Sequence, residues 1–229
     1  MKKEKSIRQK RSDALPPPPI RTIEQALGST DLTIEWLAGD GSDRCYYRIR
    51  SSTLKHPCVL MQLSGEDAKA IQAGRYDWIE VQKDLHDANI YTPKLINSIP
   101  EHAALIIEDY GDDMLETVVM RFLRSGNTAI AEQLYSKALK LTAQLLSIKG
   151  NGNSVWKEKS FDAERFAWEL RFFQQKFIEA VAGIKLTPGQ QQQFDRDNET
   201  LAQTYGKLST HFVHRDFHSR NIMVRNGEL

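Results

Sequence analysis

The stretch FVHRDFHSRN, residues 212–221, decides how this sequence is interpreted. Two apolar residues lead into a segment with two histidines, two arginines, an aspartate, a serine and an asparagine. A core strand cannot bury these side chains unpaired, because burying polar groups without hydrogen bonds costs free energy. We therefore expect a functional loop at the end of an apolar strand.

The spacing in this loop is H-R-D-x-x-x-x-N, with the aspartate at 216 and the asparagine at 221. Phosphoryl transfer requires a positioned hydroxyl and neutralised charge on the moving phosphoryl group. We predict that Asp216 is the catalytic base and that the amide oxygen of Asn221 is a Mg²⁺ ligand. His214 and Arg215 are expected to brace the loop. The alternative is a polar loop in which the aspartate and asparagine merely cap local turns.

The composition fits a folded chain without a membrane span. The 229 residues are 40% hydrophobic, and they contain no apolar run of about 18 residues, the length of a transmembrane helix. The N-terminus is basic but lacks the apolar region of a secretory signal. Cys45 and Cys58 make neither a disulfide framework nor a metal motif. We predict a cytoplasmic protein without a membrane partner.

The charge is unevenly distributed. Residues 1–11 hold six basic side chains and one acidic one, which leaves 25 basic and 29 acidic groups, a balance of −4, in the rest of the chain. An acidic body does not suit nucleic-acid binding. Residues 1–20 are predicted to be a disordered basic and proline-rich tail, in which Pro16–Pro19 form a stiff spacer.

The first 110 residues are predicted to be rich in strands after the tail. A short helix is expected to end near Gly28, and one further helix is expected over residues 75–90, with Trp78, Val81 and Leu85 on one face. β-Branched and aromatic residues between turn signals predict the strands. These lie within residues 32–50, which contain two strands and a loop, and within 56–63, 93–99 and 102–113.

The remaining residues are predicted to be helical. Three helices are expected, over residues 128–150, 161–183 and 187–208. The last begins with a capping box from Thr187 to Gln190. Helical spacing predicts buried apolar stripes on the first two. The stripe of the first contains Ile130, Leu134, Ala138, Leu141 and Leu145, and that of the second contains Phe166, Leu170, Phe173, Phe177 and Val181.

With these motifs in order, the chain resembles the aminoglycoside phosphotransferase and choline kinase family, which has a protein-kinase-like fold. It is most similar to bacterial kinases that phosphorylate N-acetylmuramate or N-acetylglucosamine at the anomeric hydroxyl. The stretches that carry this resemblance are ALGS, LAGDGSDRCYYRI, VLMQ, IEDYGDD and FVHRDFHSRNIMV. The resemblance implies ATP and Mg²⁺ as cofactors and a small sugar as partner; it gives no oligomeric state.

The resemblance implies nucleotide contacts in two segments. The first is a loop whose backbone N–H groups would approach phosphate, although a surface hairpin would look the same. Its candidate residues are Gly39, Gly41, Ser42 and Asp43. The second is a hinge, where backbone groups from Glu108 to Tyr110 would meet the adenine.

Substrate contacts are less defined by the resemblance. His218, two residues after the aspartate, is typical of small-molecule kinases and would orient the loop or contact substrate. Glu169 or Trp168 would reach the acceptor, with an ordinary packed helix as the alternative. Arg220 would offset phosphate charge or face solvent.

The sequence departs from the common kinase pattern in two places. Gln62 stands where most kinases have a phosphate-binding lysine, so Glu80 is expected to be a surface residue. Asn226-Gly227 predicts a hairpin, and the returning strand should lead to a second metal-binding aspartate, but the sequence ends at Leu229. We therefore expect a truncated kinase with an unpaired edge at Ile222–Val224, little transfer activity and a tendency to aggregate.

Together these observations predict an α+β, two-lobed protein-kinase-like fold. The nucleotide-binding lobe is expected at residues 21–108, and the incomplete helical lobe at 109–229. The predicted function is ATP-dependent phosphorylation of a hydroxyl on a small molecule, with a cell-wall amino sugar as acceptor. Two alternatives remain open: a nucleotide-binding pseudokinase, and a phosphotransferase that acts on an aminoglycoside.

Overall fold

The computed structural model describes residues 15–39, 44–149, 154–208 and 211–229. They form two compact units. The first comprises Met1–Gln144 with His214–Leu229, and the second comprises Leu145–Val213. Each unit is described by itself. The predicted division into lobes at residue 108 stays a prediction.

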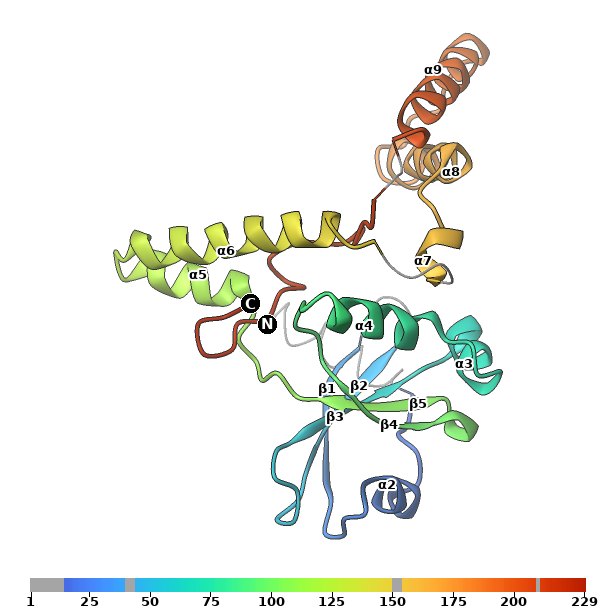
Figure 1. Ribbon diagram of the computed structural model, residues 1–229. Helices are drawn as coiled ribbons and strands as arrows, with labels where there is room; N and C mark the ends of the chain where they lie inside the picture. The colour runs from blue at the N-terminus through green and yellow to red at the C-terminus, as the bar shows by residue number, and fades with distance from the viewer. Residues whose placement is uncertain (1–14, 40–43, 150–153, 209–210) are drawn as a thin grey trace. The chain divides into compact units, whose positions relative to one another are not determined.

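A five-stranded antiparallel sheet forms the centre of the first unit (Figure 1). Its strand order is β1-β2-β3-β5-β4. The strands are β1 (Thr33–Gly39), β2 (Cys45–Arg50), β3 (Cys58–Gln62), β4 (Leu95–Ile99) and β5 (Ala104–Glu108). All five strands were predicted from their β-branched and aromatic runs, and the structure confirms them.

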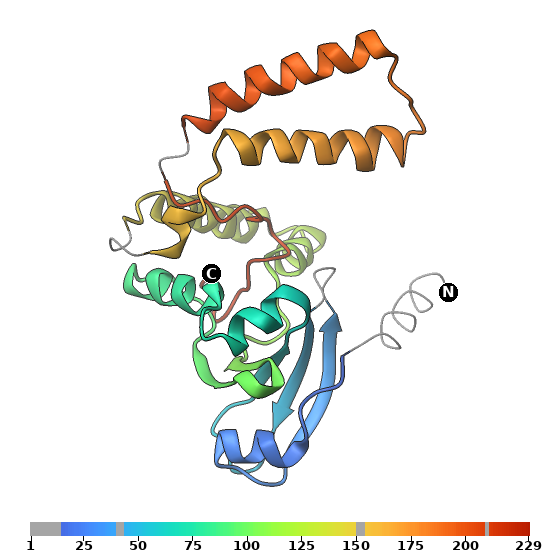
Figure 2. The same cartoon turned by 90° about the vertical axis from the view of Figure 1, so that its right-hand side faces the viewer.

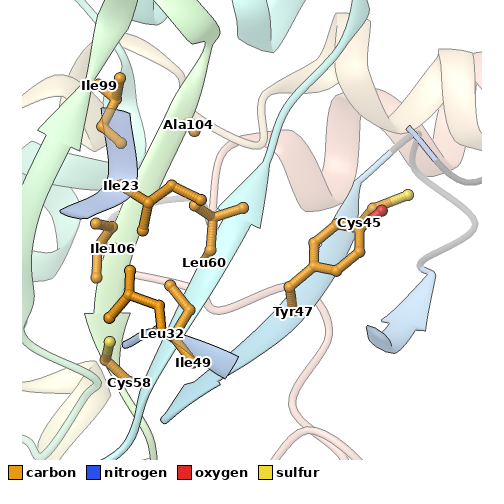
Figure 3. Close-up of a cluster of buried hydrophobic side chains, with 10 residues drawn as sticks. All are labelled: Ile23, Leu32, Cys45, Tyr47, Ile49, Cys58, Leu60, Ile99, Ala104 and Ile106. Atoms are coloured by element: carbon orange, nitrogen blue, oxygen red, sulfur yellow. The ribbon is translucent and has the colours of Figure 1, made fainter. Parts of the chain in front are cut away.

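Helix α2 (Ile20–Leu27) covers one face of the sheet. Its Ile23 is fully buried and packs into the cluster that contains Leu60 and Ile106, as Figure 3 shows. The helix ends at Gly28, which has a left-handed backbone with a φ of 62°, a conformation that glycine adopts at little cost. The predicted helix and its end are thus confirmed.

The predicted tail is shorter than expected. The Leu15 side chain packs against the same cluster, the Tyr47 hydroxyl donates a hydrogen bond to the Leu15 carbonyl, and Pro18 is buried. Helix α2 already begins at Ile20. The expectation of disorder is therefore wrong for residues 15–20, because the proline-rich segment has apolar contacts with the sheet. Residues 1–14 lie outside the described part of the chain.

The opposite face of the sheet is covered by α3 (Gly65–Gln72) and α4 (Asp77–Asp87). Helix α4 was predicted, and its Leu85 is buried. Helix α3 was not predicted, since Ile71 is its one buried residue and an apolar stripe is missing. Both helices pack against strand side chains at alternating positions, such as Val59 and Met61 of β3 and Leu105 and Ile107 of β5.

Two further helices of this unit are α5 (Leu115–Arg124) and α6 (Thr128–Leu146). Their apolar sides share a cluster with Ile222 from the C-terminal segment. Leu134, Ala138 and Leu145 of the predicted stripe are buried on α6. The C-terminal segment is therefore part of the packed unit rather than a free end.

The second unit consists of helices. They are α7 (Val155–Glu158), α8 (Ala163–Phe173), the π-helix η2 (Gln174–Glu179) and α9 (Pro188–Gly206). Helices α8 and α9 lie side by side (Figure 2). The capping box from Thr187 to Gln190 is present, as predicted.

The prediction of a buried aromatic stripe is wrong for its C-terminal half. Phe173, Phe177 and Val181 are 48%, 53% and 75% exposed. The π-helical turn accounts for the later position Val181, because its wider turn adds a residue and rotates the positions that follow, whereas Phe173 lies before it. Gln174, the residue after Phe173, lies on the buried side, at 8% exposure. Helix α9 covers the side of α8 that carries Ala167, whose carbonyl accepts a hydrogen bond from the buried Asn198 of α9, and its Tyr205 stacks on Phe166.

Candidate functional site

The loop at residues 214–221 brings the two predicted site residues into direct contact. The Nδ2 atom of Asn221 donates to Asp216 Oδ2 at 2.6 Å and to the Asp216 carbonyl at 3.0 Å. Arg215 has a positive φ of 68°, an uncommon conformation for a non-glycine residue. It precedes the aspartate in the tight turn. Because the amide nitrogen of Asn221 is bonded to Asp216, its amide oxygen is left for another ligand.

His218 contacts the other carboxylate oxygen of Asp216. Its Nε2 lies 3.1 Å from Asp216 Oδ1, and its Nδ1 accepts a hydrogen bond from the Arg220 backbone N–H at 3.2 Å. A neutral imidazole with Nδ1 as acceptor carries its proton on Nε2. We therefore assign the Nε2 tautomer, which donates to the carboxylate. The Asp216 side chain is still 70% exposed, so solvent or a ligand can reach it.

His214 and the residues before it differ in part from expectation. The predicted strand is not formed: residues 212 and 213 have no strand assignment. The polar loop instead connects to a short paired segment downstream. His214 contacts the Phe217 ring edge-to-face, and desolvation lowers the pKa of His214. A neutral ring against an aromatic side chain suits the predicted bracing role.

The segment after the loop is paired rather than unpaired. Met223 forms a bridge with Met114, the Leu115 N–H donates to the Ile222 carbonyl at 2.8 Å, and the Val224 N–H donates to the Asp113 carbonyl at 2.7 Å. The expectation of an unpaired edge at Ile222–Val224 is thus wrong for the side that residues 113–115 occupy.

The predicted hairpin turn is present at the end of the chain. Asn226 and Gly227 both have positive φ, at 55° and 78°, between bridged residues Arg225 and Glu228. Two positive φ values define the turn favoured by Asn-Gly. Lys137 on α6 donates to the Gly227 carbonyl and to Glu228, each at 2.6 Å, which attaches the turn to the helix.

The predicted phosphate loop is described in part. Gly39 is the last residue of β1, whereas Gly41, Ser42 and Asp43 lie outside the described residues. Arg44, the residue before β2, forms an ion pair with Asp67 of α3 at 2.7 Å.

The predicted hinge follows β5. Glu108 accepts a hydrogen bond from Arg225 at 2.6 Å, and the same guanidinium lies over the Tyr110 ring, 5.3 Å from its centroid. The Tyr110 hydroxyl donates to the Thr92 carbonyl at 3.1 Å, and burial raises the pKa of Tyr110. The hinge and its contact with adenine stay predictions, but the Glu108 and Tyr110 side chains are held by Arg225 and by the Thr92 carbonyl.

Gln62 has contacts within the sheet domain. It is 8% exposed, and its Nε2 donates to the His102 carbonyl at 2.7 Å. Its neighbours across the strands are Cys45 and Ala104, which belong to the cluster on the α2 face. Glu80 is exposed, as predicted.

The other candidate substrate residues are Glu169, Trp168 and Arg220. Glu169 belongs to the second unit, and its carboxylate accepts from Arg165 at 2.9 Å. Arg165 also stacks over the Trp168 ring at 4.2 Å. Arg220 lies 3.9 Å from Glu116 and is mostly exposed. Arg220 belongs to the Asp216 loop itself, and the substrate roles of all three residues stay predictions.

Sequence reasoning missed a buried ion cluster beside the hinge. Arg48 of β2 is paired with Asp109 at 2.6 Å and with Asp112 at 2.9 Å. Hydrogen bonds from Arg48 lower the pKa of Asp112. The available signal was an arginine between the buried Tyr47 and Ile49, followed far along the chain by the acidic segment EDYGDD.

Among the described residues, no cluster of three or more histidine, cysteine, aspartate or glutamate side chains is arranged to hold a metal ion. The role of Asn221 as a Mg²⁺ ligand stays a prediction. Cys45 and Cys58 are both buried and free. Within the described part of the chain, every helix is too short or too polar to cross a membrane.

The antiparallel sheet followed by helices, with an HRDxxxxN loop, defines a protein of the α+β, kinase-like class. Residues 34–229 match the phosphotransferase enzyme family APH, and the chain belongs to this family. It is also similar to the N-acetylmuramate/N-acetylglucosamine kinase of Neisseria meningitidis serogroup B (strain ATCC BAA-335 / MC58), with 25% identity over 200 residues. The alignment covers 86% of this chain and 54% of that kinase, so the chain spans about half the length of its relative.

Proposed function

We propose that the protein transfers the γ-phosphoryl group of ATP to a hydroxyl of a small molecule, with an amino sugar as acceptor. The observation that carries this proposal is that Asp216 contacts both His218 and Asn221 within the loop. Asp216 has one carboxylate oxygen bonded to His218 and the other to Asn221, yet it remains 70% exposed. Family membership supports a phosphotransferase, and the named relative supports an amino sugar.

Asp216 would act on the acceptor hydroxyl. In the proposed step, the hydroxyl oxygen forms a bond to the γ-phosphorus while its proton passes to the Asp216 carboxylate. The bond from the γ-phosphorus to the bridging oxygen breaks, and ADP leaves with that electron pair. The hydrogen bonds from His218 and Asn221 hold the carboxylate in one orientation, which is how positioned general bases contribute to rate.

Asn221 would hold Mg²⁺ on the nucleotide phosphates through its amide oxygen. The fit rests on the hydrogen bonds from the amide nitrogen, both of which go to Asp216 and so turn the oxygen away from that residue. A Mg²⁺ ion supplies neutralisation of charge on the phosphate oxygens when bound. The contact from Asn221 to Asp216 would thereby keep the base and the metal ligand at a fixed separation.

The proposal is tested by label transfer from γ-labelled ATP. N-acetylmuramate and N-acetylglucosamine should be preferred to choline and kanamycin as acceptors. Asp216→Asn should lower the transfer rate by about 10²–10⁴-fold, the usual contribution of a general base, with little change in ATP affinity. The matched control is Asp87→Asn, a change of the same size at an exposed position at the end of α4.

Each alternative has its own outcome in this assay. ATP binding without transfer to any acceptor would favour a nucleotide-binding pseudokinase. Clear preference for kanamycin would favour a phosphotransferase that acts on aminoglycosides. Unchanged transfer by Asp216→Asn would contradict the role of this aspartate.

A further inference from the structure

Arg48 uses its whole guanidinium group on one short segment. Nε and Nη2 donate to Asp109 at 2.6 and 3.1 Å, and Nη1 and Nη2 donate to Asp112 at 3.1 and 2.9 Å. Nη2 also donates to the Gly111 carbonyl at 3.2 Å. The planar fork of arginine matches carboxylates in this two-bond manner, which lysine cannot reproduce.

The segment that Arg48 holds is residues 109–112, directly after β5. Gly111 has a φ of 86°, so the backbone can turn back toward β2, and its N–H donates to Asp109 at 2.8 Å. The side chains of Arg48 and Asp109 are 9% and 7% exposed, whereas that of Asp112 is 76% exposed. Removal of Arg48 would leave the Asp109 charge buried and unpaired, which is costly.

The continuation of this segment is attached to the segment that contains Asn221. The backbone N–H groups of Leu115 and Glu116 donate to the carbonyls of Ile222 and Ser219 at 2.8 and 3.0 Å. The Val224 N–H donates in the other direction, to Asp113. Residues 109–116 therefore contact β2 through Arg48 at one end and residues 219–224 through backbone hydrogen bonds at the other.

We propose that Arg48 is a positioning residue that sets the location of the Asn221 segment relative to the sheet, by fixing residues 109–112 to β2. This role rests on the proposed function, in which Asn221 holds the metal of the nucleotide. It differs from an ordinary stabilising ion pair, because the effect of losing Arg48 is specific to residues 113–116 and 219–224.

Hydrogen exchange of the purified chain without ligands tests the proposal. In Arg48→Gln, the amides of Leu115, Glu116 and Val224 should exchange on the order of tenfold faster, the scale expected for loss of hydrogen bonds to charged groups. The control is Arg50→Gln on the same strand. Arg50 pairs with the exposed Glu35 and not with residues 109–112. The amides of Leu115, Glu116 and Val224 should therefore keep their exchange rates in this variant.

A second variant keeps the test decisive if Arg48→Gln does not fold. Asp112→Asn removes charge from the exposed partner and retains its size, and it should accelerate the same amides to a smaller extent. A fall in melting temperature with unchanged exchange at Leu115, Glu116 and Val224 in both variants would overturn the positioning role. Equal acceleration in Arg50→Gln would overturn it as well.

The exchange experiment requires neither nucleotide nor sugar, so its outcome is separable from that of the proposed function. In the label-transfer assay, Arg48→Lys should lower the transfer rate, because lysine keeps the charge but not the fork, while Arg50→Gln should not. Faster exchange with no transfer by the unmodified protein would support the positioning role and count against the proposed function.

Discussion

The sheet of the first unit and the α8–α9 hairpin bury their apolar side chains to different extents. Leu60 and Ile106, on neighbouring strands, are fully buried, whereas Phe177 and Val181 are 53% and 75% exposed. The central strands have helices against both faces, while α8 and α9 cover each other on one side. An apolar stripe in a sequence thus predicts an apolar face, but it does not show which element, if any, packs against that face.

The largest expected effect in this comparison belongs to the sheet. Ile106→Ala should lower the free energy of unfolding by about 2–5 kcal/mol, because it leaves a cavity among residues that are fully buried. Urea denaturation followed by circular dichroism measures the change. The control is Ile96→Ala on β4, where the side chain is 50% exposed and the loss should stay within about 0.5 kcal/mol. Equal losses in both variants would show that the sheet is not the tightly packed region.

The helical hairpin has one close contact that can be broken. A Cβ added at Gly206 would lie 2.3 Å from the Ala163 backbone nitrogen, which cannot move without shifting α8. Gly206→Ala should therefore destabilise the hairpin by about 1–3 kcal/mol, as overpacking does. Hydrogen exchange of α8 and α9 amides reports the loss.

The control for this change lies in the same helix. A Cβ at Gly189 would meet no atom within 4 Å, so Gly189→Ala should be neutral or stabilise α9 by up to about 1 kcal/mol through helix propensity. Protection that falls equally in both variants would point to a general effect of alanine rather than to the contact between α8 and α9.

The strands were predictable because each is a short β-branched or aromatic run between turn signals. Helix α3 was not, since it begins with Gly65, Glu66 and Asp67 and buries Ile71 alone. Helix α5 was also missed, because its adjacent valines at 118 and 119 read equally as strand. The π-helical turn has no signal in the sequence, and it rotates the later positions of the predicted aromatic stripe, such as Val181.

The candidate site was predictable where its residues are close in sequence. Asp216 and Asn221 lie within one loop, so their spacing indicated both as candidates, although not the hydrogen bond between them. The pairing of Arg48 with Asp109 joins residues 61 positions apart, and only the strand register brings them together. The pairing of residues 113–115 with 222–224 is equally non-local.

The smallest expected effect on stability lies on the exposed aromatic side of the hairpin. Phe177 is 53% exposed and stacks on Phe173 with centroids 5.3 Å apart. Phe177→Ser should change the free energy of unfolding by about 0.5 kcal/mol or less, the range of surface substitutions. It should nevertheless lower light scattering of the concentrated protein, because exposed apolar patches promote association.

The matched control is Phe212→Ser in the same unit. Phe212 is 5% exposed and contacts Trp156 edge-to-face at 5.4 Å, so the same exchange should cost about 3–5 kcal/mol, as loss of a buried phenylalanine does. If Phe177→Ser lost as much stability as Phe212→Ser, the aromatic side would be covered in solution. If Phe177→Ser changed neither the light scattering nor the stability, the protein would associate through another surface. The exposed aromatic side of the second unit would then have no role in association.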